Sequence, residues 1–146
     1  MDGITIRNFT KVPADVVLID DTLISVGLVS NIAKNQAQNF RAWIPFTLGA
    51  TGGFQLQVIV PAAGVKYAVT INFYDTVGGV LLYDAQTSSA PFGDVLTGAG
   101  TYWAEVTGYV RNGVNAGIID IQVAQNTTDV LTATVLEGAS IDVCKS

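Results

Sequence analysis

The stretches RAWIPFTL (residues 41–48) and FQLQVIV (residues 54–60) decide the fold, because apolar and polar residues alternate in both of them. In the second stretch, one side of an extended chain carries Phe54, Leu56, Val58 and Val60, and the other side carries the two glutamines. The same pattern recurs in three further stretches, at residues 67–74, 102–110 and 119–123. Alternation with a period of two is typical of antiparallel strands that bury one face and expose the other.

Turn residues separate these stretches, and helical periodicity is almost absent. Asp75-Thr-Val-Gly-Gly79 precedes one apolar run, and Asn112-Gly113, a strong hairpin signal, precedes another. Residues 85–100 are rich in Ser, Thr, Gly and Pro, which predicts a long loop. Many short strands joined by such turns predict an all-β fold of eight or more antiparallel strands, either a β-sandwich or a jelly roll.

The length of 146 residues suits a single domain that buries its own core. We assign residues 22–146 to the jelly-roll domain and residues 1–21 to an N-terminal arm, because the first segment fits the strand pattern least well. Two short apolar runs flank Pro13 in this arm, and they pack either on the body or on a neighbouring chain. They supply four candidate contact residues: Ile4, Ile6, Val16 and Val17.

The composition is unusually apolar, with 49% hydrophobic and only 13% charged residues. Because so few residues are charged, part of the exterior is expected to be apolar. Exposed apolar surface usually marks a contact with a partner, and we therefore expect an oligomer or a docked subunit. The net charge of −5 and the scattered Lys and Arg residues predict no nucleic-acid partner. Residues 42–65 carry no charge, but Pro and Gly interrupt them, and we expect no membrane span. The first residues lack the pattern of a secretory signal peptide.

The residue types needed for common catalytic sites are missing or dispersed. The chain has no histidine, which removes the Ser-His-Asp and Cys-His arrangements. Its acids stand mostly in turns, and the glycine-rich run Gly49–Gly53 lacks the lysine of a phosphate-binding loop. The single cysteine, Cys144, excludes an intrachain disulfide. We therefore expect no enzyme activity, no cofactor and no metal site.

Four aromatic residues fall on the strand faces opposite the core sets: Trp43, Tyr74, Trp103 and Tyr109. Aromatic side chains on the wet face of a sheet are enriched at interfaces, since they offer a large contact area at low entropic cost. The alternative is that a second layer of the protein buries both faces of these strands. These residues are candidate surface contacts.

The C-terminal third, residues 101–143, resembles a module common in virion proteins of tailed bacteriophages. The matching elements are Ala116-Gly117 after a hairpin, Ala124-Gln125-Asn126 at a strand end, and the segment TVLEGASI at residues 134–141. An upstream part, with NFRAW at residues 39–43 and TGGF at residues 51–54, is also similar. The resemblance covers about 120 residues, 22–143, and leaves the arm outside it.

This resemblance implies an antiparallel β-sandwich of the jelly-roll type with about eight to ten strands. The implied fold is similar to the trimeric jelly-roll heads of complement and tumour-necrosis-factor proteins. Such modules occur as capsid decoration proteins, head fibres and tips of tail fibres. A short chain with an arm suits a homotrimeric decoration (cement) protein, made in the host cytoplasm, that binds the major capsid protein on the outer surface of the virion head. The alternative is a tail-fibre or spike head that binds a host surface glycan through Trp43 or Trp103. A small glycan hydrolase is the third reading, and the missing acid pair counts against it.

Overall fold

The computed structural model describes residues 6–49, 52–61, 65–76, 79–86, 90–94, 96 and 98–145. These residues form twelve strands and no helix. The strands are β1 (Ile6–Lys11), β2 (Val16–Leu18), β3 (Ile24–Ile32), β4 (Ala37–Leu48), β5 (Phe54–Ile59), β6 (Lys66–Tyr74), β7 (Val80–Gln86), β8 (Phe92–Asp94), β9 (Gly100–Arg111), β10 (Gly117–Ala124), β11 (Ala133–Val135) and β12 (Ser140–Lys145). In this part of the chain no helix is long and apolar enough to cross a membrane.

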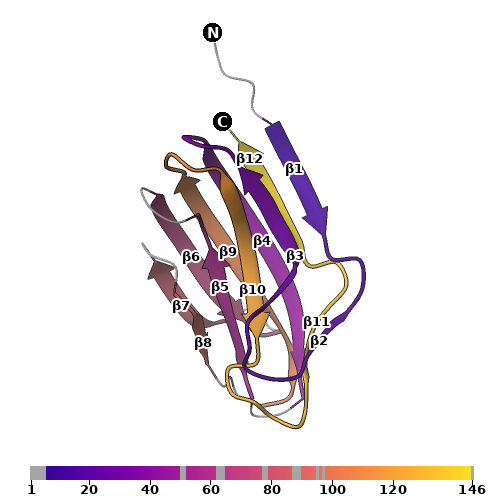
Figure 1. Cartoon of the computed structure of the whole chain (residues 1–146). Coiled ribbons are helices and arrows are strands. Elements are labelled where there is room, and N and C mark those ends of the chain that lie inside the picture. The colour runs from indigo at the N-terminus through magenta and orange to yellow at the C-terminus, as the bar shows by residue number, and fades with distance from the viewer. Residues whose placement is uncertain are drawn as a thin grey trace.

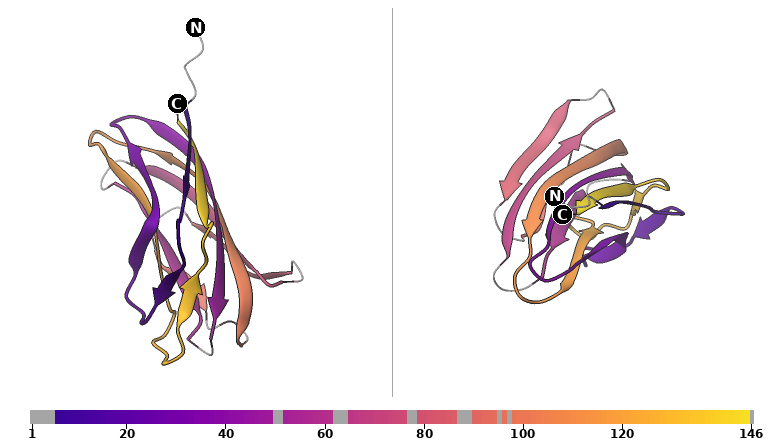
Figure 2. Two further views of the ribbon diagram at one scale, coloured as in Figure 1. Left: turned by 90° about the vertical axis from the view of Figure 1, so that its right-hand side faces the viewer. Right: turned by 90° about the horizontal axis from the view of Figure 1, so that it is seen from above.

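The strands build two antiparallel sheets that face each other (Figure 1). The large sheet has the order β1-β12-β4-β9-β6-β7, and β2 and β11 extend it beside β4. The small sheet has the order β3-β10-β5-β8. Figure 2 shows the two layers from the side and from above, with the two described chain ends close together at one end of the sandwich.

The strand order is that of a jelly roll with one added hairpin. β1 pairs with β12, and β2 pairs with β11. Therefore β1 and β2 together act as one interrupted strand, and β11 and β12 together act as another. When the β6–β7 hairpin is left out and each interrupted strand is counted once, eight strands remain. Renumbered from 1 to 8 along the chain, they have the orders 1-8-3-6 and 2-7-4-5 in the two sheets, which is the double Greek key of a jelly roll. This confirms the predicted fold class. The count reaches twelve because the chain breaks near Pro13 and again between β11 and β12, and because the hairpin widens the large sheet.

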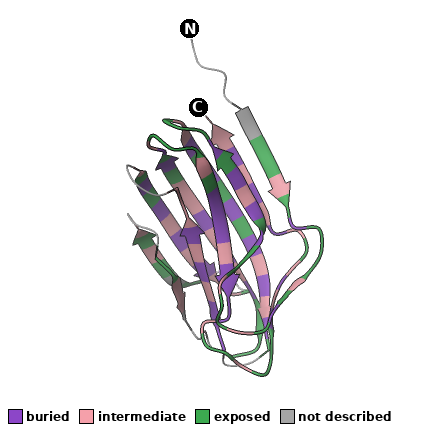
Figure 3. Cartoon of the chain, viewed as in Figure 1, coloured by how far each residue is buried: buried purple, intermediate pink, exposed green. Residues whose placement is uncertain are grey.

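The core lies between the sheets and is made by the alternating apolar sets (Figure 3). Phe46 of β4 and Phe54 of β5 stack with their ring centroids 3.9 Å apart, which joins the two sheets directly. Phe73 of β6 packs edge-on against both rings, and Tyr102 of β9 stacks on Phe46. Phe46, Phe54 and Phe73 are fully buried. The period-two pattern therefore predicts the inner faces of β4, β5, β6, β9 and β10 correctly.

The N-terminal segment packs on the body of its own chain. β1 pairs with β12 over six residue pairs, and β2 pairs with β11 over three. Val12 and Leu18 are each only 2% exposed, so this segment contributes side chains to the core. The sequence left open whether residues 1–21 pack on the body or on a neighbouring chain. The structure describes residues 6–21 of this segment, and they pack on the body.

One sequence-based expectation is wrong. Residues 85–100 are not a single long loop, because they contain β8, whose residues Phe92–Asp94 pair with β5. Gly93 allows β8 to approach β5 closely, because a Cβ at this position would lie only 2.4 Å from the carbonyl oxygen of Phe54. Phe92 packs against Phe73, with 5.3 Å between the ring centroids. A three-residue strand is too short to show alternation in the sequence.

Candidate binding surfaces

Three of the predicted surface aromatics meet on the outer face of the large sheet. Trp43, Tyr74 and Trp103 come from the neighbouring strands β4, β6 and β9, and in the register Trp103 lies opposite Tyr74. The ring centroids are 5.6 Å apart for Trp43–Trp103, 6.1 Å for Tyr74–Trp103 and 6.4 Å for Trp43–Tyr74. Trp43 is 38% exposed and the other two rings are half-buried. We call these three residues the aromatic cluster.

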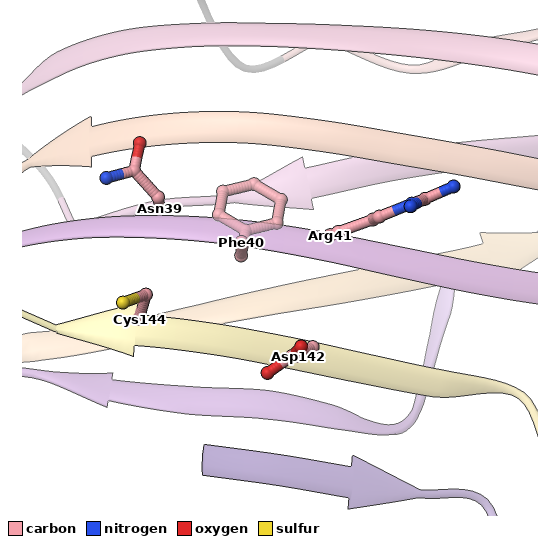
Figure 4. Close-up of a pocket in the computed structure, with 5 residues that line it drawn as sticks. All are labelled: Asn39, Phe40, Arg41, Asp142 and Cys144. Carbon is pink, nitrogen blue, oxygen red and sulfur yellow. The ribbon is translucent and has the colours of Figure 1, made fainter. Parts of the chain in front are cut away.

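A shallow trough begins at Trp43 and follows β4 and β12. It is lined by Asn39, Arg41 and Trp43 of β4 and by Ser140, Asp142 and Cys144 of β12. It consists of two depressions, of about 270 and 330 Å³, which share Arg41 and Asp142. Figure 4 shows the depression that lies toward Cys144. The trough exists because β12 places small side chains beside the longer ones of β4.

The trough carries charges of both signs. The guanidinium of Arg41 forms an ion pair with Glu105 of β9 at 2.7 Å, and the side chains are 65% and 19% exposed. Asp142 lies opposite Arg41 in the register, and Lys11 of β1 lies opposite Ser140. Two cationic and two anionic side chains therefore surround this surface, so its local charge is close to balanced.

A second surface lies at the end of the sandwich opposite the described chain ends (Figure 1). Five exposed apolar residues gather there, and we call them the apolar end: Val17, Ile19, Ile24, Val130 and Leu131. The first three line a mostly apolar groove of about 300 Å³ between β2 and β3. The exposed fractions reach 69% at Ile19 and 95% at Val130. None of these five side chains is buried in the core.

A buried glutamine fixes the two halves of the apolar end relative to each other. Gln125, 1% exposed, donates from Nε2 to the carbonyl oxygen of Leu18 at 2.8 Å. Its Oε1 accepts from the backbone N–H of Asp129 at 2.7 Å. The N–H of Asp21 donates to Oγ1 of Thr128 at 3.2 Å. These bonds hold the loop after β10 against the segment that joins β2 to β3.

The remaining predicted contact residues lie apart from the aromatic cluster. Tyr109, 37% exposed, lies on the same outer face opposite Asn39, and its ring makes no stacking contact with the cluster among the described residues. Val16 is half-buried, while Val17 belongs to the apolar end. Ile6 begins β1, and its side chain lies outside the described part, as does the whole of Ile4.

Sequence reasoning missed the trough and most of the apolar end. The trough depends on the side-by-side placement of β4 and β12, about 100 residues apart in the chain, and no local pattern reports that pairing. Ile19 did carry a signal, because it directly precedes the acidic pair Asp20-Asp21, which favours an exposed turn. An isoleucine beside such a turn is a candidate for exposure.

The described residues show no group of three or more His, Cys, Asp or Glu side chains that could hold a metal ion. One titratable group inside the sandwich is perturbed. Burial, with a smaller contribution from the Asp84 carboxylate, raises the pKa of Tyr67 well above its usual value. Its hydroxyl has no hydrogen-bond partner in the described part of the chain. A neutral tyrosine of this kind adds an apolar ring to the core.

Comparison with known proteins gives distant structural likenesses and no sequence family. No family model and no curated protein matches the chain. Among solved structures, the VP2 subviral particle of infectious bursal disease virus is 10% identical with a TM-score of 0.26, and 97% of this chain covers 40% of that one. A pilus protein of Bacillus endospore appendages is 15% identical, with coverages of 94% and 95% and a TM-score of 0.23. Tailspike protein 4 of bacteriophage CBA120 is 13% identical over 92% of this chain and 19% of that one, with a TM-score of 0.22.

Proposed function

We propose that the chain is a non-catalytic structural protein of a bacteriophage virion. In this proposal it is a homotrimeric decoration protein that binds the major capsid protein on the outer surface of the head. It has no nucleic-acid or membrane partner, in keeping with its net charge of −5. The resemblance of residues 22–143 to virion modules supports the virion assignment, and the apolar end is the observation that carries the docking role.

The apolar end is suited to binding another protein. Burying a Val, Leu or Ile side chain fully contributes about 1.5–3 kcal/mol, so five partly exposed residues offer a substantial driving force once a partner covers them. Gln125 holds the two halves of this surface in place before binding, which lowers the cost of ordering it. A contiguous group of exposed apolar residues usually marks such an interface.

The resemblance to trimeric modules suggests the trimer, and the composition and a symmetric lattice are consistent with it. Only 13% of the residues are charged, and assembly would remove more apolar surface from water. Threefold repetition also multiplies weak contacts to a capsid through effective concentration. Light scattering on a size-exclusion column should give a mass of three times 15.3 kDa. A mass of one times 15.3 kDa would contradict a preformed trimer.

Docking is tested by co-sedimentation of the full chain with heads purified from the phage that encodes it. Ile24→Ser removes an apolar contact from the apolar end, and Ile118→Ser on β10 is the matched control, because the two isoleucines are 39% and 44% exposed. We expect Ile24→Ser to weaken head binding at least tenfold and Ile118→Ser to leave it within twofold. Equal effects of the two substitutions, or no head binding by the unchanged protein, would refute the docking proposal.

A further inference from the structure

We propose that the aromatic cluster and the trough together form a binding site for a neutral, linear oligosaccharide. This inference does not rest on the docking role, because the site lies on the outer face of the large sheet and the apolar end lies at the tip of the sandwich. It rests on three observations: the three-ring cluster, the adjoining trough with its mixed polar and apolar lining, and the balance of charges along it.

The aromatic cluster offers an apolar surface of the kind on which sugar rings stack. A pyranose ring has apolar C–H faces, and these gain dispersion contacts when they lie on an aromatic ring. Trp43, Tyr74 and Trp103 touch one another, with centroids 5.6–6.4 Å apart, so their orientations are fixed before any ligand arrives. Trp43 keeps 38% of its surface open and adjoins the trough directly.

The polar groups of the trough favour a sugar over a protein as the occupant. Asp, Glu and Lys are depleted at protein interfaces, and Glu105, Asp142 and Lys11 surround this trough. Covering the Arg41–Glu105 ion pair with apolar groups would also remove it from water without compensation. Sugar hydroxyls both donate and accept hydrogen bonds, so they can replace the water around Arg41, Ser140 and Asp142. A few polar groups beside an apolar platform are typical of sites for small ligands.

The charge and the shape of the site narrow the ligand class further. Lys11 and Arg41 are balanced by Glu105 and Asp142, so the site offers no net attraction to an anionic sugar. The two depressions follow the strand direction from Asn39 to Trp43, and the cluster continues beyond them. At about 3.3 Å per residue the trough alone is roughly 13 Å long, which suits a short segment of a linear chain.

The chain has two tryptophans, Trp43 and Trp103, and both belong to the aromatic cluster. Intrinsic tryptophan fluorescence therefore reports on this site alone. We would titrate the full-length protein with cellohexaose, maltohexaose and hexa-N-acetylchitohexaose, and with hexagalacturonate as the anionic comparator, and confirm the affinities by calorimetry. We expect at least one neutral hexasaccharide to shift the emission and to bind at least tenfold more tightly than hexagalacturonate.

Three variants separate this site from the rest of the molecule. Trp43→Ala should weaken binding at least tenfold, Trp43→Tyr should keep it within about threefold, and Ile24→Ser, at a residue of matched exposure, should leave it unchanged. The inference is overturned if no neutral hexasaccharide binds, if the anionic one binds best, or if Trp43→Ala binds as the unchanged protein does. It is also overturned if Trp43→Ala abolishes head binding or lowers the oligomeric mass, since the cluster would then be a protein contact.

Discussion

The stacked pair Phe46–Phe54 provides the sharpest test of the architecture, because it joins the two sheets at the centre of the core. Both rings are fully buried, and their centroids are 3.9 Å apart. Truncation of a buried phenylalanine to alanine costs about 3–5 kcal/mol. We therefore expect Phe46→Ala to lower the free energy of unfolding by that amount. At roughly 2–4 °C per kcal/mol for a chain of this size, Tm should fall by about 6–20 °C.

Urea unfolding followed by circular dichroism measures this loss. Val114→Ala is the control, because Val114 is 74% exposed and should change stability by less than about 0.5 kcal/mol. A double-mutant cycle of Phe46→Ala with Phe54→Ala should return a coupling of about 0.5–1.5 kcal/mol for the aromatic pair. A loss below about 1.5 kcal/mol for Phe46→Ala would refute the claim that this pair holds the sheets together.

Two further changes test the packing elsewhere. Gly108→Ala places a Cβ 2.5 Å from Cζ of Phe40 and 2.8 Å from Cγ2 of Val69, so chemical denaturation should show a loss of about 1–3 kcal/mol from overpacking. Tyr67 keeps its proton when folded, while the unfolded chain loses it above its usual pKa of 10.0. Stability should therefore fall as the pH rises above 10, and Tyr67→Phe should reduce this fall in Tm measurements at pH 8 and pH 11.

The sequence predicts the faces of the strands because that information is local. A residue two positions along a strand returns to the same side, so the pattern in residues 41–48 places Ile44 and Phe46 inside and Trp43 outside without knowledge of the partners. The fold class follows from the same source. Trp103 and Tyr74 also lie on the outer face in the structure, where both residues are half-buried.

The partners of each strand could not be predicted in this way. Trp43 and Trp103 meet because β4 pairs with β9 across about 60 residues of sequence, and β1 reaches β12 across almost the whole chain. Such pairings are selected by the total burial of the sandwich, to which every strand contributes, and not by any one segment. The trough and the placement of residues 6–18 both depend on these long-range pairings.

The position of the two proposed sites allows them to act at the same time. The apolar end occupies the tip of the sandwich, whereas the trough runs along the outer face of the large sheet, and the described chain ends lie at the opposite tip (Figures 1 and 2). A subunit docked on a shell by its apolar end would thus keep the trough open to solvent. In that orientation a single jelly roll can hold a lattice with apolar contacts and present its aromatic cluster to a polysaccharide. The Ile24→Ser and Trp43→Ala variants should consequently lose separate activities, and each should retain the other.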